Sequence, residues 1–384
     1  MWLRLPLDAC VRRTHTWRSA RTMTRISVVD MAAMADGREG QLRVAQALSK
    51  AFADTGFAVV TSTPVPEIAL AQLRRSAMDF FHQPLAEKQM VNEGSAPGYG
   101  SSPYCRLEEN GAQLLGDFTK PDDLVESLTY RPHEGLERLP DRPPELRPAV
   151  QEFGERVARF REVLNCACDL ALGQDEGFFA SKCGKGREAL RLAFYPDLEA
   201  FKRFHSDEHS VKSTLGRRAA HYWHPDPFKW EGATLLDGQM RYGEHVDSFG
   251  LTILNLDPAN PEGLQVQIGE EWVDVPWVKG SFVLNVGALL SRWTNGYWKA
   301  AVHRVLFKRG QRLSIVSGAL RPDDDVMLEP CGPGALAGEK FAPVRAGDFC
   351  QERVALHRPS YLQQKQLDAE AAQRLSEDIR SYRQ

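Results

Sequence analysis

The chain has 384 residues, of which 42% are hydrophobic and 26% charged, and its formal net charge is -3 at pH 7. This length and apolar content predict a soluble globular protein with a large buried core, in one large domain or two modest ones. The mixed charges give no electrostatic case for nucleic acid or an anionic membrane, and no apolar run reaches the roughly 20 residues of a membrane span. We therefore expect a small-molecule partner, no nucleic acid, no membrane, and a monomer.

The cysteines and the N-terminus bear on the cellular compartment. The seven cysteines are odd in number and scattered along the chain, which is typical of a protein from a reducing compartment. Cys166 and Cys168 could contribute to a metal site, but no second cysteine pair lies nearby to complete it. Residues 1–25 carry six arginines and one acidic residue, which is the composition of an organelle transit peptide. The alternatives are that these residues form a disordered extension, or that the first residue of the protein is Met23. We expect a cytoplasmic protein, unless residues 1–25 direct it to an organelle.

Residues 26–180 are predicted to form a helix-rich region with a few strands, because apolar residues recur there mostly at helical spacing. The stretch 92–147 is rich in Gly, Pro and Asp and is interpreted as long surface loops. The expected elements are strands at 26–30 and 57–61 and helices at 40–54, 66–81 and 148–172.

After residue 180 the pattern changes to short β-rich runs separated by turn residues. Few of the connections are long enough for a crossover helix, which favours an antiparallel sandwich or jelly roll over a parallel sheet. We assign the β-rich domain to residues 181–360, and expect a C-terminal helix within 361–384. The β-rich runs are 190–196, 250–257, 263–268, 271–276, 281–287, 303–307 and 312–320.

Three residues with metal-binding side chains stand at the ends of these predicted strands. His245 and Asp247 are two residues apart, so on an extended chain they point to one face; a hydrogen-bonded polar pair at a strand end is the alternative. His303 begins a later run and is the candidate for a third ligand. Two histidines and one carboxylate occupy three positions on Fe(II) and leave three open for substrate and oxygen.

Arg312 and Ser314 follow on the next predicted strand, again two residues apart and therefore on one face. A guanidinium holds a carboxylate through two parallel hydrogen bonds, and a hydroxyl adds another. The pair predicts a dicarboxylate ligand, and a surface ion pair of Arg312 is the alternative.

Several blocks of the sequence together resemble a known family. The chain contains HVDSFGLTIL, GLQV, GSFVLNVGALLSRWTNGYWKAAVHRV and RLS in the order and near the spacing of the isopenicillin N synthase-like iron(II) and 2-oxoglutarate-dependent oxygenases. Its ISVVD, GFAVV and AMDFFHQPLAEKQ segments are similar to the N-terminal region of that family. The likeness spans roughly residues 26–360. It implies a mainly β fold with flanking helices: a double-stranded β-helix core, jelly-roll and cupin-like, with a helical N-terminal region.

The resemblance also implies a reaction and the residues that carry it. The reaction uses Fe(II), O2 and 2-oxoglutarate to hydroxylate or desaturate a small metabolite, or to close a ring in it, with release of succinate and CO2. Ala193 stands where many members have an Asn, so one co-substrate contact is missing. The matching residues are the iron ligands His245, Asp247 and His303, the carboxylate-binding pair Arg312 and Ser314, and the co-substrate contact Tyr195.

Two other functions are left open by these residues. An oxidase of the isopenicillin N synthase type uses the iron without 2-oxoglutarate, and Arg312 and Ser314 then hold a carboxylate of the substrate. The missing Asn at position 193 favours this alternative. The other is a ligand receptor without activity on the same scaffold, and the complete ligand set speaks against it.

Substrate recognition is predicted to come from two polar segments, the insertion 197–240 and residues 98–106. We interpret the histidines of the insertion as facing solvent or substrate and not a second metal. Aromatic residues near the site are expected either to line it or, more simply, to pack in the core. The residues concerned are His205, His209, His221 and His224 in the insertion, Tyr99, Ser101, Tyr104 and Arg106 in the second segment, and the aromatic residues Phe194, Phe249, Trp272 and Trp293.

Overall fold

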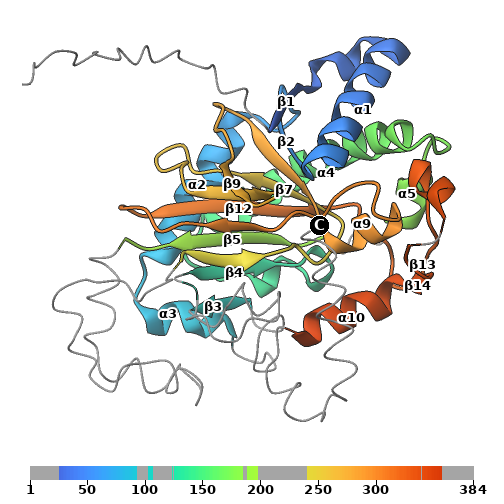
Figure 1. Ribbon diagram of the computed structural model, residues 1–384. Helices are drawn as coiled ribbons and strands as arrows, with labels where there is room; N and C mark the ends of the chain where they lie inside the picture. Colours follow the sequence, from blue (N-terminus) through green and yellow to red (C-terminus); the bar gives the residue numbers. More distant parts are fainter. Residues whose placement is uncertain are drawn as a thin grey trace, which may run out of the picture.

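Two mainly antiparallel sheets face one another in the computed structural model, and most of the helices lie on the outer side of the larger sheet (Figure 1). Buried side chains from both sheets, among them Val59, Tyr195 and Val266, form one cluster between the sheets. The fold is therefore the expected jelly roll with flanking helices. The structure describes residues 26–92, 103–106, 123, 125–184, 188–197, 240–338 and 340–356.

The larger sheet has eight strands in the order β1-β2-β10-β7-β12-β5-β4-β3, and all neighbouring strands are antiparallel except β1 and β2. Four of its strands precede residue 180, so the sheet is continuous across the border predicted between the helix-rich region and the β-rich domain. The strands are β1 (Ser27–Asp30), β2 (Phe57–Thr61), β3 (Tyr104–Arg106), β4 (Glu126–Tyr130), β5 (Leu190–Tyr195), β7 (Leu251–Asn255), β10 (Phe282–Val286) and β12 (Arg312–Ala319).

The smaller sheet has four antiparallel strands in the order β6-β11-β8-β9. Because side chains alternate between the two faces of a strand, each strand of the larger sheet offers one face to the smaller sheet and the other to the helices. On β5, Ala193 and Tyr195 lie in the cluster between the sheets, whereas Leu192 and Phe194 lie in the cluster under the helices. The strands are β6 (Tyr242–His245), β8 (Leu264–Ile268), β9 (Glu271–Asp274) and β11 (His303–Val305), and β13 (Met327–Leu328) pairs separately with β14 (Val344–Arg345).

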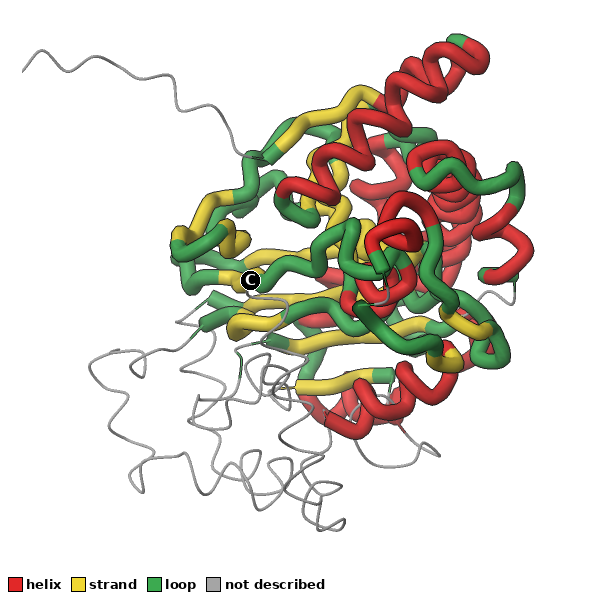
Figure 2. Tube along the Cα trace, turned by 45° about the vertical axis from the view of Figure 1, so that its right-hand side comes forward, coloured by secondary structure: helices red, strands yellow, loops and turns green. Residues whose placement is uncertain are grey.

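The long helices α1, α2 and α4 each bury an apolar stripe, and Figure 2 shows most of the helices gathered on one side of the strands. Phe81 of α2 stacks on Phe194 of β5 with 5.0 Å between ring centroids, and Phe160 of α4 packs on Phe282 of β10 at 5.6 Å. No helix in the described part of the chain combines the length and the apolar character that crossing a membrane requires. The helices are α1 (Gly37–Asp54), α2 (Glu67–Phe81), α3 (Leu85–Gln89), α4 (Leu146–Ala171), α5 (Phe178–Lys182), α9 (Ala288–Trp293) and α10 (Ala346–Leu356), with 3-10 turns at Met31–Ala35, Met90–Asn92, Pro132–Glu134, Leu136–Arg138 and Gly332–Ala337.

The predicted elements appear within a few residues of their expected bounds, except in one stretch. The interpretation of 92–147 as loops is partly wrong, because Glu126–Tyr130 forms strand β4 inside the larger sheet. Strand β4 was not predicted because its polar residues are not typical of a buried strand. Glu126 is buried and accepts a hydrogen bond from Lys88 at 2.6 Å, and this bond allows a charged residue to occupy a core position. Residues 1–25, and the helix predicted within 361–384, lie outside the described residues.

Candidate active site

The structure brings His245, Asp247 and His303 together. His245 ends β6, His303 begins β11, and the two are direct partners in the antiparallel ladder. Their imidazole centroids are 4.1 Å apart. Asp247 Oδ1 lies 3.4 Å from His245 Nε2 and 3.6 Å from His303 Nε2. One donor atom from each residue lies within 4.8 Å of the others, so a single metal ion can bind all three.

Backbone carbonyl groups hold the two imidazoles in the orientation that metal binding needs. His245 Nδ1 lies 2.8 Å from the carbonyl oxygen of Gly243, and His303 Nδ1 lies 3.1 Å from that of Ala301. Because a carbonyl oxygen only accepts, each Nδ1 carries the proton, and the lone pair is left on Nε2, the atom that faces Asp247. Burial, followed by the neighbouring His245, lowers the pKa of His303 to about 4, so this imidazole is neutral at pH 7.

The second carboxylate oxygen of Asp247 is bound by the larger sheet. Oδ2 accepts hydrogen bonds from Thr252 Oγ1 on β7 and from Asn285 Nδ2 on β10, the latter at 2.6 Å. Burial by itself raises the pKa of this carboxyl group, but the two imidazoles and the hydrogen bonds outweigh burial and lower the pKa below its ordinary value. Asp247 is therefore ionised, with Oδ1 turned toward the histidines.

The segment that carries Asp247 is fixed by the start of helix α9. The N–H group of Ala288 donates to the carbonyl oxygen of Asp247 at 2.7 Å. Glycine is required where this segment crosses the end of β12, because a Cβ atom at Gly250 would overlap the carbonyl oxygens of Ala319 and Leu320. Close backbone packing thus sets the position of the carboxylate ligand.

The donor set fits Fe(II). Two imidazole nitrogens and one carboxylate oxygen leave further coordination positions open, whereas a structural zinc site is closed by four protein ligands. Within the described ranges this is the one group of three or more His, Cys, Asp and Glu side chains that could hold a metal ion. Cys166 and Cys168 are free thiols on α4 and belong to no such group there.

Arg312 and Ser314 of β12 lie in register with Tyr195 and Ala193 of β5, on the face turned to the space between the sheets. Arg312 is fully buried; its Nε donates to Ser314 Oγ at 3.2 Å and its Nη1 to the carbonyl oxygen of Glu262 at 2.8 Å. Its Nη2 has no hydrogen-bond partner among the described residues. A buried guanidinium with an unused N–H group beside a hydroxyl is suited to bind a carboxylate.

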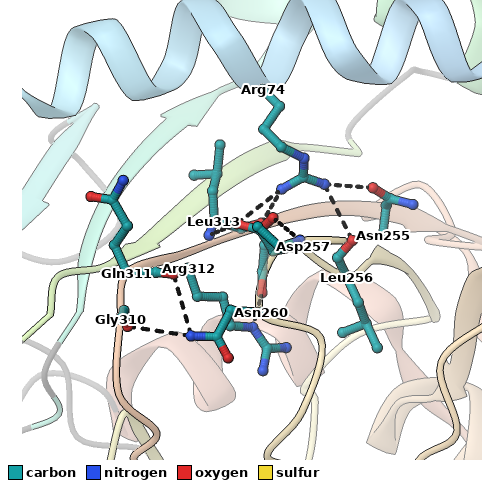
Figure 3. Close-up of polar contacts among 11 residues, drawn as sticks. Arg74, Asn255, Leu256, Asp257, Asn260, Gly310, Gln311, Arg312 and Leu313 are labelled. Carbon is teal, nitrogen blue, oxygen red and sulfur yellow. Dashed lines mark hydrogen bonds and ion pairs between the residues drawn. The ribbon is translucent and has the colours of Figure 1, made fainter.

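A network of hydrogen bonds fixes the start of β12, where Arg312 lies (Figure 3). Arg74 of α2 donates to the carbonyl oxygen of Leu313 and, at 2.7 Å, to Asn255 Oδ1. Asp257 Oδ2 accepts a hydrogen bond from the N–H group of Leu313 at 2.8 Å. The backbone on which Arg312 stands is therefore held from two sides before any ligand binds.

The four aromatic residues expected near the site lie in different places. Phe194 and Trp293 pack in the core under the helices, which is the simpler of the two expectations. Trp272 lies on β9, with the guanidinium carbon of Arg304 3.8 Å from its ring centroid. Phe249 is 37% exposed and belongs to the segment that follows β6. Of the four, only Phe249 lies within two residues of a candidate ligand, Asp247, in the chain.

The predicted substrate-binding segments are described only in part. Residues 93–102 and 198–239, with the four histidines of the insertion, lie outside the described residues, as does the side chain of Arg106. The interpretation of Tyr104 as a polar loop residue is wrong: it lies in β3, is buried, and donates to Glu126 Oε2 at 2.7 Å. A tyrosine can bury its ring and still satisfy its hydroxyl group in this way.

Sequence reasoning did not identify Thr252, Asn285 or Arg241. Asn285 carries a usable signal, since it is the one polar residue of the buried strand FVLNV and a buried amide needs a partner. Thr252 carries none, because threonine is common in strands. Arg241 is fully buried just before β6, and its burial is visible only in the structure.

Comparisons with known proteins agree with this geometry. Residues 214–318 match the 2OG-Fe(II) oxygenase superfamily, and residues 26–150 match the family described as non-haem dioxygenase in morphine synthesis, N-terminal. The first match contains the three metal-ligand candidates together with Arg312 and Ser314.

Relatives and solved structures extend the likeness over most of the chain. Homoarginine-6-hydroxylase 2-ODD-C23.1 of Arabidopsis thaliana is 26% identical over 313 residues, which cover 81% of this chain and 85% of the relative. Isopenicillin N synthase of Streptomyces griseus is 25% identical over 344 residues, covering 85% and 94%. The dioxygenase for auxin oxidation of rice, a solved structure, has a TM-score of 0.62 at 21% identity and covers 87% of this chain and 99% of its own. That structural likeness shows the fold.

Proposed function

The chain belongs to the isopenicillin N synthase-like iron(II)/2-oxoglutarate-dependent oxygenases, and from this premise we propose that His245, Asp247 and His303 bind the iron at which it oxidises a small organic substrate. One arrangement of side chains carries the proposal. Three candidate ligand atoms lie within 4.8 Å of one another, and the larger of the two sheets carries a fully buried arginine, Arg312, with an N–H group that has no partner among the described residues. The reaction is an oxidation by O2, a hydroxylation or desaturation, in which 2-oxoglutarate is converted to succinate and CO2.

The residues of the chain position the reactants. Iron(II), when bound, supplies the coupled oxidation of 2-oxoglutarate and substrate by O2. Arg312 and Ser314 bind the distal carboxylate of 2-oxoglutarate by charge-assisted hydrogen bonds, beside the ring of Tyr195. The apolar cluster between the sheets excludes bulk water, so that the oxidant meets the substrate before it meets solvent.

The substrate of this chain is a small organic molecule. Isopenicillin N synthase among those relatives supports a second candidate, an oxidase that takes all electrons from its substrate and uses no 2-oxoglutarate. Ala193 gives that candidate its structural support, since the position offers no polar atom to a co-substrate. We propose a cytoplasmic location, which the scattered free cysteines support.

Anaerobic titration distinguishes the two candidates. Protein loaded with Fe(II) in the absence of oxygen is titrated with 2-oxoglutarate, and we expect the weak visible charge-transfer band of a bound 2-oxo acid. In air we expect slow succinate formation without added substrate. His303→Ala should give neither signal, and Arg312→Met should keep the iron and require far more 2-oxoglutarate. If the wild-type protein bound Fe(II) but gave neither band nor succinate, the oxidase would replace the dioxygenase as the function.

A further inference from the structure

Arg241 is a second buried arginine near the carboxylate-binding pair, and no sequence pattern assigned it a role. It immediately precedes β6, and its side chain is 0% exposed. Its Nη2 donates to the carbonyl oxygen of Lys308, at 2.6 Å, and to that of Gly310. Its Nε and Nη1 have no hydrogen-bond partner among the described residues. Two of its three nitrogen atoms are thus unused in the interior, where an unpaired donor is costly.

Arg241 and Arg312 lie against the same aromatic ring. The guanidinium carbon of Arg241 is 5.9 Å from the ring centroid of Tyr195, and that of Arg312 is 5.8 Å from it. The two cations are close enough to affect one another: burial, and then the charge of Arg312, lowers the pKa of Arg241 to about 10. Arg241 is still protonated at pH 7. The guanidinium groups of Arg241 and Arg312 therefore both lie near the ring of Tyr195, and each has N–H groups without a partner among the described residues.

Neither cation forms an ion pair with a carboxylate in the described part of the chain. The acid whose charge acts on both is Asp257, and its oxygens are engaged elsewhere. Oδ2 accepts from the N–H group of Leu313 at 2.8 Å and lies 3.7 Å from Arg74, and Oδ1 accepts from the N–H group of Ala259 at 3.0 Å. Two buried cations that have no acidic partner among the described residues form a site for an anion.

We propose that Arg241 is a second cationic donor to the distal carboxylate of 2-oxoglutarate, alongside Arg312 and Ser314. This inference rests on the proposed function, because it adds a residue to the co-substrate site. Ala193, the partner of Ser314 in register, offers no polar atom, and a donor from outside β5 can take the place of this missing contact. A carboxylate has two oxygens and several acceptor directions, so it can accept hydrogen bonds from three donor groups. The site should therefore discriminate strongly in favour of 2-oxo acids that end in a carboxylate.

The competing explanation for the burial of Arg241 is that the residue only stabilises the turn 308–310, since its Nη2 donates to two carbonyl oxygens of that turn. Asn260 holds the same turn: its Nδ2 donates to the carbonyl oxygen of Arg309 at 2.8 Å and to that of Gly310 at 3.3 Å. Asn260→Ala loosens this turn without removing a charge. It is therefore the matched control for a variant of Arg241.

Calorimetric titration with two ligands of equal length separates the two roles. Protein loaded with Mn(II), which does not turn over, is titrated with 2-oxoglutarate and with 2-oxopentanoate, whose chain ends in a methyl group. We expect Arg241→Met to weaken 2-oxoglutarate binding about ten- to hundredfold and to leave 2-oxopentanoate binding unchanged. Arg241→Lys keeps the charge and should keep most of the preference. Asn260→Ala should change both affinities by the same factor.

The outcomes that overturn the inference are distinct from those that overturn the function. Equal weakening of both ligands by Arg241→Met, or a methionine variant that keeps the full preference for 2-oxoglutarate, would assign Arg241 to the turn alone. If Arg241→Met does not fold, Arg241→Gln, which also removes the charge, is compared with Arg241→Lys in the same way, and equal preference in the two variants would overturn the inference. If the wild-type protein binds both ligands equally, the proposed function fails as well, because Arg312 then binds no distal carboxylate.

Discussion

Asn285 offers the sharpest test of how the protein positions its proposed metal ligands. It is 2% exposed on β10, and its amide donates to Asp247 Oδ2 at 2.6 Å. A hydrogen bond to a charged group contributes about 1.5 to 3 kcal/mol. Asn285→Ala removes one of the two bonds to that oxygen and leaves the bond from Thr252. Removing an outer hydrogen-bond partner of a metal ligand typically lowers metal affinity about 10- to 100-fold, or about 1.4 to 2.8 kcal/mol, and we expect a loss in this range.

Calorimetry with Mn(II) measures this loss, and thermal unfolding of the metal-free protein reports stability separately. Asn255→Ala is the matched control, because Asn255 is also a buried asparagine of the larger sheet but bonds to Arg74 and to the carbonyl oxygen of Ser281. We expect the control to lower the Tm and to leave the Mn(II) affinity unchanged. A folded Asn285→Ala protein with wild-type Mn(II) affinity would refute the reasoning that the larger sheet sets the ligand geometry.

Three further substitutions test other parts of the site and fold. His303→Ala should abolish Fe(II) binding and turnover while the circular dichroism spectrum stays that of the wild type; an active variant would exclude this ligand. Arg312→Met should raise the KM for 2-oxoglutarate about 100-fold and leave Mn(II) affinity unchanged, so a shift in both would point to a general distortion. Lys88→Met should lower the free energy of unfolding by about 3 to 5 kcal/mol in denaturant titrations, because the buried Glu126 loses its ion pair. Glu126→Gln in the same chain should recover part of that loss, and no recovery would contradict the charge argument.

The residues of the site were predictable to the extent that local geometry determines them. His245 with Asp247, and Arg312 with Ser314, share faces because residues two apart on a strand always do. The convergence of His303 on the first pair is different, since it depends on β11 pairing with β6, and no local spacing encodes that pairing. His303 was a candidate from its place at the start of a predicted strand, and the resemblance to a family then assigned it to the same iron as the first pair.

The residues that support the site could not be predicted from the sequence for a related reason. The contacts of Asn285 and Arg241 are with segments far away in the chain, Asp247 after β6 and the turn 308–310, and these segments come together only when the two sheets pack. Strand β4 was missed because its buried Glu126 breaks the apolar pattern, and the compensating Lys88 lies in a segment far away in the sequence. In each case a polar residue is stabilised by a distant partner, which a periodicity argument cannot see.

The helix-rich region contributes directly to the metal site through β2. Phe57 of this strand packs edge-on against the imidazole of His303, with 5.3 Å between ring centroids. Phe57 is also the direct cross-strand partner of Asn285, which binds Asp247. Neighbouring residues on one face of the larger sheet thus support two of the three ligands, one through a ring contact and one through a hydrogen bond. Strand β2 precedes the β-rich domain by more than a hundred residues, yet it helps to position the proposed metal ligands, so the proposed iron chemistry depends on the packing of the two sheets as a unit.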